Sequence, residues 1–208
     1  MTTRGGGHRT MKGARILPPR WRGADTMGMV APVYYTADMV RALPEDGNRY
    51  EVVYGELLVT PAPRLWHQEL AVRLVRTVSE YLEREPVGHL LPSPADISWT
   101  SDTLVQPDLF VAPLDQVRTL DWTQVKDLLL VIEVLSPSTL RYDRFTKRRL
   151  YQERRIPSYW AVDGEERWVE VWTPAAQFPT VERERLVWHP AGAREAFSLE
   201  LRELFRPI

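Results

Sequence analysis

The clearest periodic signal in the chain is a helical one between residues 66 and 84. Apolar side chains recur there at intervals of three and four, which places them on one stripe of a helix; they are Leu70, Ala71, Leu74, Val75, Val78, Tyr81 and Leu82. His67 falls at the N-terminal end of that stripe. A shorter helix is predicted earlier, after Thr36 or Asp38, because both residue types cap helices.

Apolar runs predict strands in the rest of the chain. Residues 49–60 form two runs around Tyr54-Gly55, and residues 159–172 form two more around Asp163-Gly164, so each pair is expected to be a hairpin. A proline-rich turn after the long helix precedes strands predicted at 96–100, 104–112 and 128–135. The last run has no polar alternation, which is typical of a central strand covered on both faces.

A second helix is predicted at residues 141–154, after the break at Ser136-Pro137-Ser138-Thr139. The tail is expected to add a strand and a short terminal helix. From residue 66 the order is helix, three strands, helix, strand. This order predicts an α/β fold with a mixed sheet flanked by helices.

Composition supports one globular domain and removes several alternatives. The chain has 208 residues, of which 44% are hydrophobic and 26% charged, and it contains no cysteine. Disulfides, thiolate metal sites and cysteine nucleophiles are thereby excluded. The longest apolar run, residues 128–134, is far shorter than the roughly 20 residues that cross a bilayer, so no membrane partner is expected.

Charge divides the chain into two parts. Residues 1–28 carry six basic side chains and one acidic one, whereas residues 29–208, the expected single domain with a small β-rich tail, carry 21 basic and 27 acidic ones. The first part is predicted to be either a disordered basic leader or the result of a start codon assigned too early. A basic arm that touches nucleic acid is a further reading. Because the segment lacks the apolar core of a signal peptide, we expect a cytoplasmic location.

The acidic body argues against a protein that coats nucleic acid through charge alone. One local exception is the run from Arg141 to Arg155, in which seven of fifteen residues are basic and two are acidic. Most runs of this kind are solvated helix faces, and that is the simplest interpretation of this one.

Two carboxylates occupy positions where a solvated side chain is not expected. Glu133 interrupts the apolar run 128–135, and a buried carboxylate needs a hydrogen bond, a cation or a metal ion. Asp108 follows Pro107, which a central strand tolerates only near its start or at a bulge. If the two strands are neighbours, strand parity allows the two carboxylates to converge.

Lys147 is one of only three lysines and lies on the predicted helix that follows the Glu133 strand, on a stripe with Asp143 and Tyr151. Two carboxylates and a lysine suit metal-dependent phosphodiester hydrolysis. The carboxylates hold a hard cation such as Mg²⁺, the cation polarises the phosphate and activates water, and the lysine stabilises developing charge. The competing interpretation is a buried structural ion pair between Glu133 and Lys147.

Five blocks of the chain resemble the Uma family of restriction endonucleases, a bacterial group within the PD-(D/E)XK nuclease superfamily; in order they are RYEVVYGELLV, PAPRLWHQELAVRL, VQPDLFV, LLVIEVLSPST and DRFTKRRLYQERRIPSYWAVD. The resemblance runs from about Met29 to Trp172. It implies the restriction-endonuclease-like α/β/α sandwich with a mixed central sheet and an αβββαβ core. It also implies that Asp108 and Glu133 bind magnesium, for which manganese can substitute, with the backbone carbonyl of Val134 in the metal shell.

The chain departs from the superfamily pattern at one position. The lysine of that pattern would stand two residues after Glu133, where this chain has Leu135. The resemblance suggests that the lysine has moved to Lys147. The expected function is a metal-dependent endonuclease that hydrolyses DNA. The alternatives are a catalytically silent nuclease-fold module that binds nucleic acid or protein, and a structural partner in a larger assembly.

Several further residues have both a functional and a structural interpretation. His67 is a candidate to touch the scissile phosphate or orient a water, or else it packs at the helix start. Glu51 and Glu56 match the family blocks, and Glu69 lies on the first helix, yet all three also suit ordinary polar positions. Ser136 is predicted to be a turn residue. The spacings of the histidines do not match those of zinc ligands. The sequence contains no glycine-rich phosphate-binding loop, which argues against an NTPase.

Trp168 and Trp172 share one face of a predicted strand. They are expected either to pack in the core against the second helix or to form a hydrophobic dimer surface. From the second interpretation we expect a homodimer, which would place two single-strand-cutting sites on one DNA duplex.

Overall fold

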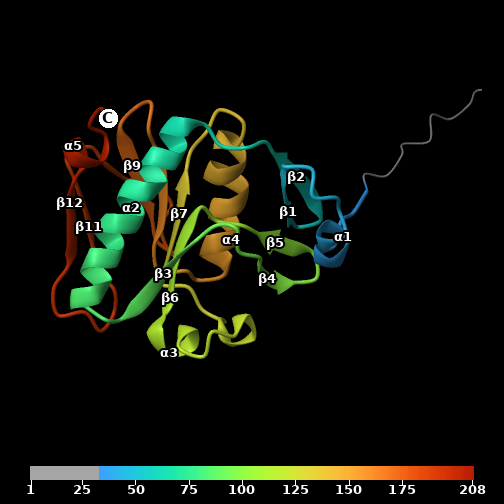
Figure 1. Ribbon diagram of the computed structural model, residues 1–208, viewed down its shortest axis with the longest axis horizontal. Helices are drawn as coiled ribbons and strands as arrows, with labels where there is room; N and C mark the ends of the chain where they lie inside the picture. The colour runs from blue at the N-terminus through green and yellow to red at the C-terminus, as the bar shows by residue number, and fades with distance from the viewer. Residues whose placement is uncertain (1–32) are drawn as a thin grey trace, which may run out of the picture. The chain divides into compact units, whose positions relative to one another are not determined.

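A mixed six-stranded sheet forms the centre of the computed structural model, which describes residues 33–208 (Figure 1). The strand order is β10-β9-β8-β7-β6-β3, and within this sheet β7 and β8 run parallel while the other neighbours are antiparallel. The strands are β3 (Gly88–Pro92), β6 (Leu109–Pro113), β7 (Leu130–Val134), β8 (Tyr159–Asp163), β9 (Trp168–Trp172) and β10 (Thr180–Glu182). The leader predicted for residues 1–28 lies outside the described residues.

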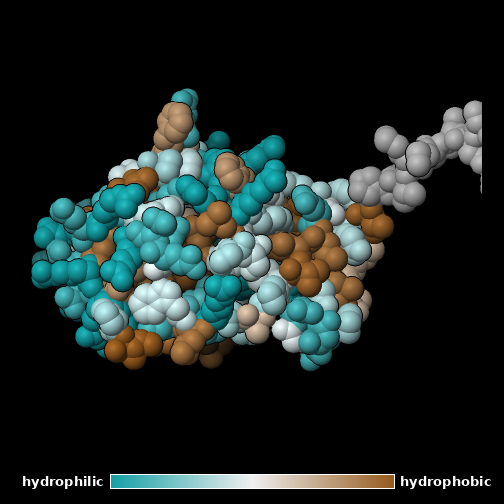
Figure 2. Space-filling view, turned by 90° about the horizontal axis from the view of Figure 1, so that it is seen from above, coloured by the Kyte–Doolittle hydropathy of each residue, from teal (hydrophilic) through white to brown (hydrophobic). Residues whose placement is uncertain are grey.

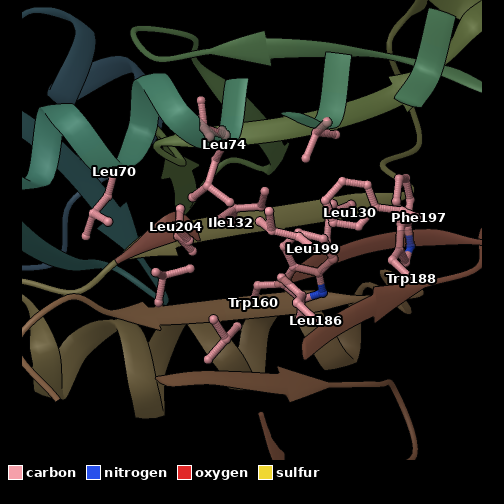
Figure 3. Close-up of a cluster of buried hydrophobic side chains, with 14 of the residues drawn as sticks. Leu70, Leu74, Leu130, Ile132, Trp160, Leu186, Trp188, Phe197, Leu199 and Leu204 are labelled. Atoms are coloured by element: carbon pink, nitrogen blue, oxygen red, sulfur yellow. The ribbon is translucent and has the colours of Figure 1, made fainter. Parts of the chain in front are cut away.

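Helix α2 (Leu65–Arg84) covers one face of this sheet, as its apolar stripe predicts. Leu70 and Leu74 of the helix share a buried cluster with Leu130 and Ile132 of β7 (Figure 3). The C-terminal tail joins the same cluster through β11 (Arg185–Trp188), β12 (Phe197–Glu200) and α5 (Leu201–Leu204). In the part of the chain that the structure describes, no helix is long and apolar enough to cross a membrane.

The opposite face is covered by η2 (Tyr142–Lys147), a π-helical segment, and by α4 (Arg148–Glu153), which continues it. Leu150 and Tyr151 of α4 are fully buried in a cluster with Phe110 and Val131 of the sheet. The helix predicted at 141–154 is therefore present, but its first part has the wider π-helical turn. Such turns are rare and are frequent at functional sites.

A second sheet, of four strands in the order β2-β1-β5-β4, lies beside α4 (Figure 1). Its strands are β1 (Arg49–Val53), β2 (Glu56–Thr60), β4 (Ile97–Thr100) and β5 (Thr103–Val105), and α1 (Ala37–Arg41) packs against β1 and β5. The remaining short helices, α3 (Leu114–Val117) and η1 (Trp122–Gln124), lie between β6 and β7.

Local signals at the small sheet are confirmed. The predicted hairpin forms between β1 and β2, and Tyr54 and Gly55 between them have φ angles of 54° and 79°, as a tight hairpin turn requires. The Thr36 side chain accepts a hydrogen bond from the Met39 N–H at 3.2 Å and so caps α1.

Apolar side chains gather on the surface at the end of the described residues that is formed by α1 and the small sheet (Figure 2). Met39 of α1 and Val59 of β2 are exposed there.

Two strand predictions are wrong. Residues 104–112 are not one strand, because residues 106–108 leave the small sheet and enter the large one. Pro107 at this junction has no N–H to donate to a sheet, which explains the break. In addition, β3 forms where a proline-rich turn was expected; it pairs with β6 along its whole length and, as an edge strand, tolerates Pro92.

The hairpin at Asp163-Gly164 is present, but its turn is longer than the dipeptide suggested. Residues 164–167 separate β8 from β9, and the positive φ, 58°, falls on Arg167. Gly164 is needed for close approach instead, since a Cβ there would lie 2.5 Å from Leu70 Cδ1 and 2.8 Å from Trp66 Nε1. Trp66 also donates to the Gly164 carbonyl at 3.1 Å, so this turn fixes the beginning of α2.

The order α2-β3-β6-β7-α4-β8 is the predicted αβββαβ core. The small sheet combines two separate segments of the chain: the hairpin β1-β2, which precedes α2, and the strands β4 and β5, which are inserted between β3 and β6. The central sheet has α2 and the tail on one face and α4 with the small sheet on the other. This arrangement is the α/β/α sandwich that the sequence predicts.

Candidate active site

Asp108 and Glu133 lie next to each other on neighbouring strands. β6 and β7 are antiparallel with Leu109 opposite Ile132, so Asp108, just before β6, faces Glu133. The Asp108 N–H lies 3.4 Å from Glu133 Oε2, and the Val134 N–H donates to Asp108 Oδ2 at 2.9 Å. The exposed fractions of the two acids are 7% and 1%. The strands are thus neighbours, as the parity argument requires.

Lys147 reaches the same place from the π-helical segment η2. Its Nζ atom lies 2.8 Å from Glu51 Oε1, 2.9 Å from Glu133 Oε1 and 3.5 Å from Asp143 Oδ1. The Tyr151 hydroxyl donates to Glu133 Oε1 at 2.9 Å. Lys147 and Glu51 have no exposed surface, so the ammonium group is enclosed by carboxylates.

Asp108 is held by the side chains of His67 and Arg49. His67 Nε2, at the beginning of α2, lies 3.0 Å from Asp108 Oδ2, and Arg49 of β1 donates to Asp108 Oδ1 at 2.9 Å. Burial by itself would raise the pKa of Asp108, but the hydrogen bond and charge of His67 and the charge of Arg49 lower this pKa to about 2. Asp108 is therefore ionised throughout the ordinary pH range.

Carboxylates hold the chain on both sides of Pro107. Glu51 Oε1 accepts the Gln106 N–H at 2.7 Å, and Glu133 Oε2 lies 3.4 Å from the Asp108 N–H. Because Glu51 and Glu133 also contact Lys147, the same two side chains fix both the ammonium group and the junction between the sheets.

Burial and crowding shift the remaining acids in the other direction. Burial, together with the neighbouring carboxylates, raises the pKa of Glu133 to about 8 and the pKa of Asp143 to about 6. Burial alone would lower the pKa of Lys147, but the surrounding carboxylates raise it well above its ordinary value. Lys147 is thus a fixed positive charge rather than a proton acceptor.

The cluster contains more negative than positive side chains. Four carboxylates (Glu51, Asp108, Glu133 and Asp143) accompany two permanent cations, Arg49 and Lys147. Within residues 33–208, the buried Glu51 Oε2 atom has no hydrogen-bond partner. An excess of buried carboxylate oxygen is the donor chemistry that Mg²⁺ prefers, so these residues fit a hard cation.

The side chains do not by themselves form a complete metal site. Among the described residues, no group of three or more His, Asp or Glu side chains is arranged to hold a metal ion. A set of two carboxylates and one backbone carbonyl, as expected from Asp108, Glu133 and Val134, has only two side-chain ligands.

A cleft of about 1270 Å³ opens beside Asp108. Arg49 and His67 line it together with Asp108, and so do residues 136–139, which lead into the helix that carries Lys147. The cleft lies between α2 and the small sheet, since residues of both line it. Lys147 and Glu133 are buried behind Asp108 and do not line it.

The sequence model of a family named Uma2, described as "Putative restriction endonuclease", matches residues 37–202, which is most of the chain. The chain belongs to the Uma2 family. No curated protein matches it. One similar solved structure is described as the crystal structure of "a putative nuclease belonging to DUF820 from Anabaena variabilis ATCC 29413". Its TM-score is 0.68 at 22% identity, over 82% of this chain and 97% of that chain, which confirms the nuclease-like fold.

Sequence reasoning about this Uma2 chain did not single out Arg49, and it interpreted Glu51 either as a residue that matches the family block or as an ordinary polar position on a hairpin. Both belong to β1, in the other sheet, and nothing near them in sequence indicates that β1 packs over Lys147. One signal was available. Arg49 and Glu51 share a strand face with Val53, and charged residues on a face that an apolar residue marks as buried point to partners in the interior.

The other candidates lie apart from the Uma2 carboxylates. Glu56 is exposed at the hairpin, and Glu69 accepts a hydrogen bond from Arg73 Nε at 2.7 Å. Ser136 lines the cleft, and its hydroxyl lies 2.9 Å from that of Thr139, as a turn residue would.

Trp168 and Trp172 do not form an exposed surface. Each is 8% exposed, with the Arg144 guanidinium 5.3 Å above the Trp168 ring and the Arg148 guanidinium 4.7 Å above the Trp172 ring. Packing against the second helix is confirmed, and the argument for a dimer from these tryptophans is wrong. A homodimer and a cytoplasmic location for this Uma2 protein stay predictions.

Proposed function

We propose that this protein is a Mg²⁺-dependent endonuclease that hydrolyses DNA phosphodiester bonds. The observation that carries the proposal is the convergence of Asp108 and Glu133 on neighbouring strands beside a cleft that reaches Asp108. Membership of a nuclease family agrees with it. Mn²⁺ is expected to substitute, because it accepts the same oxygen ligands.

Asp108, Glu133 and the carbonyl of Val134 would hold the cation. When bound, the cation polarises the phosphate and lowers the pKa of a water molecule. Arg49 and His67 keep Asp108 ionised and fix both of its oxygens. A ligand held in this way loses little conformational freedom when the cation binds.

Lys147 and the cleft residues have separate roles in this proposal. Lys147 orients Glu133 through the 2.9 Å contact and contributes positive charge beside the carboxylates. His67 and Arg49 line the cleft and contact Asp108, so they can bind the scissile phosphate from the cleft side.

A second function, a nuclease-fold module that binds nucleic acid without cutting it, is favoured by one observation. Both oxygens of Asp108 already have protein partners, and Lys147 already lies between Glu51 and Glu133. Such a closed network would need no cation to be stable.

Nicking of supercoiled plasmid and of circular single-stranded DNA tests the proposal. The wild-type protein should nick with Mg²⁺ or Mn²⁺ and be inactive with chelator. Asp108→Asn and Glu133→Gln should each lower the rate at least 100-fold, since even partners of metal ligands are worth about 10–100-fold. The matched control is Asp115→Asn, an exposed acid on α3, which should nick as the wild type does.

Thermal melting gives a second readout. Mg²⁺ at about 100 times its dissociation constant should stabilise the wild type by about 2.7 kcal/mol, because it binds only the folded chain. Asp108→Asn should lose this shift and Asp115→Asn should keep it. Nicking by the wild-type protein in the presence of chelator would overturn the proposal, and so would an Asp108→Asn variant that nicks at the wild-type rate. Folded protein with neither nicking nor a Mg²⁺ shift would favour the silent module.

A further inference from the structure

The helix that carries Lys147 also concentrates positive charge on its outer side. Six arginines occur between residues 141 and 155, whereas residues 29–208 as a whole are acidic; the six are Arg141, Arg144, Arg148, Arg149, Arg154 and Arg155. The two acids of this run are Asp143, which is buried, and Glu153, which pairs with Arg149. The outer side of η2 and α4 is therefore strongly basic.

Aromatic rings support four of these arginines. The guanidinium groups of Arg144 and Arg148 lie over Trp168 and Trp172. Those of Arg149 and Arg154 lie 5.4 Å and 5.7 Å from the rings of Tyr54 and Trp99. The four arginines come from η2, α4 and the residue after α4, and the four rings come from β9, β4 and the β1-β2 turn. A guanidinium held over an aromatic ring has little freedom left to lose when it binds an anion, and its N–H groups, which lie in the guanidinium plane, remain available for hydrogen bonds.

Part of this surface has no partner within the described residues. The side chains of Arg141, Arg154 and Arg155 are exposed and make no hydrogen bond or ion pair with residues 33–208. Phe145, four residues after Arg141 and four before Arg149, is 61% exposed. An exposed apolar ring on a helix that also carries unpaired arginines is suited to a ligand that has both negative charges and flat faces.

We propose that the arginine track, defined as Arg141, Phe145, Arg149, Arg154 and Arg155, binds a single strand of DNA that continues out of the cleft. The arginines contact backbone phosphates, and one base stacks on Phe145. The inference rests on the proposed function, whose substrate it specifies.

Continuity with the cleft supports this placement. Residues 136–139 line the cleft and lead directly into the helix that bears the track. The helical residues 142–153 extend about 16–18 Å, and Arg154 and Arg155 follow them directly, so the track is long enough for the smallest single-strand sites of about four nucleotides.

The exposed phenylalanine favours a single strand over a duplex. In a duplex both faces of every base are already stacked, so Phe145 would have no base to contact. In a single strand the bases are free, and stacking on an aromatic ring is largely independent of sequence. Residues 29–208 as a whole are acidic, whereas proteins that bind a duplex mainly through charge carry an excess of basic residues.

The test is binding of a fluorescent oligothymidylate of about 20 nucleotides and of a duplex of equal length, measured by anisotropy in chelator over a salt series. For the single strand, the logarithm of the association constant is plotted against the logarithm of the salt concentration. The triple variant Arg141→Gln/Arg154→Gln/Arg155→Gln should make the slope of this plot shallower by about 2, since each phosphate contact contributes about 0.7. Phe145→Ala should weaken single-strand binding at least about fivefold and duplex binding less than twofold.

Matched controls are available on the same chain. Arg118→Gln/Arg167→Gln/Arg183→Gln removes three exposed arginines elsewhere, and Phe178→Ala removes a ring that is 82% exposed; both should bind as the wild type does. The inference would be overturned if the track triple variant and the control triple variant lost single-strand affinity equally. It would also be overturned if Phe145→Ala weakened the binding of single strand and duplex equally. Because chelator prevents metal-dependent cutting, track-dependent binding without any nicking would overturn only the proposed function.

Discussion

Lys147 is the side chain whose replacement best distinguishes a catalytic role of the buried cluster from a structural one. Its ammonium group contacts Glu51 and Glu133 within 2.9 Å and is closed off from solvent. A buried charge of this kind stabilises the fold only while its partners remain, and removing one partner leaves the others uncompensated. The contribution of Lys147 to stability is therefore inseparable from that of the carboxylates.

Replacing this lysine is expected to affect both stability and rate. Lys147→Met should lower the free energy of unfolding by about 3–5 kcal/mol, because carboxylates lose their buried cation. It should also slow nicking by roughly 10² to 10³. Thermal melts with and without Mg²⁺ should show partial recovery, since the cation replaces the missing charge.

Lys126→Met, at an exposed lysine before β7, is the control and should match the wild type in both measurements. A Lys147→Met protein that melts and nicks as the wild type does would remove Lys147 from the site.

Glu133 should make stability depend on pH. Its pKa rises from an ordinary value of 4.5 to about 8 in the folded chain, so between these values the folded state holds a proton that the unfolded state has released. The free energy of unfolding should therefore fall as pH rises across this window, by up to about 1.4 kcal/mol per pH unit. Asp143, with its pKa raised to about 6, adds to the fall at the lower end.

Urea unfolding at pH 5, 6, 7 and 8 without divalent cations measures this dependence. Glu133→Gln cannot ionise and should have a flatter profile than the wild type. Asp108 acts in the opposite sense, since its lowered pKa contributes stability above pH 3.8 that is lost as pH falls through about 2, outside the measured range. Identical slopes for wild type and Glu133→Gln would contradict the assignment.

At the scale of elements, α2 is tied to the end of the chain by one buried arginine. Arg73 donates to the carbonyls of Leu204 and Arg206 at 2.8 Å and 2.5 Å, and to Glu69 at 2.7 Å. The guanidinium therefore satisfies backbone carbonyls at and just after the end of α5. Its exposed fraction is 7%, so water does not easily replace it.

Arg73→Met should lower the free energy of unfolding by about 2–3 kcal/mol, as the loss of hydrogen bonds from a charged group does. Denaturant unfolding measures it, and Arg76→Met on the exposed side of the same helix is the control. Equal stability of the two variants would show that the tail docks through its apolar side chains alone.

The elements that sequence reasoning found are those that local patterns determine. The stripe of α2, the Tyr54-Gly55 turn and the Thr36 cap depend on neighbouring residues, and they are where the pattern put them. The membership of a strand in one sheet or another depends on distant partners. For that reason the run 104–112 was taken as a single strand, and β3 was missed because its prolines resemble a turn although an edge position tolerates them.

For the whole molecule, the site combines segments with very different separations along the chain. Asp108, Glu133 and Lys147 follow one another from β6 to η2, so strand parity and helix stripes were enough to bring them together. Arg49 stands 59 residues before Asp108 and reaches it only because the small sheet folds beside the large one. Long-range packing of two sheets is not encoded in any local pattern, and Arg49 and the contact between Glu51 and Lys147 were therefore not foreseen.

The passage of the chain through Pro107 also determines how the molecule can move. Only residues 106–108 link β5 of the small sheet to β6 of the large one, and proline restricts rotation there. A tilt of the small sheet that widened the cleft would displace Asp108. It would also displace the backbone N–H groups of Gln106 and Asp108, which contact Glu51 and Glu133 respectively. We therefore expect that widening the cleft would also shift Asp108, so that a strand bound in the cleft would change the geometry of the two carboxylates.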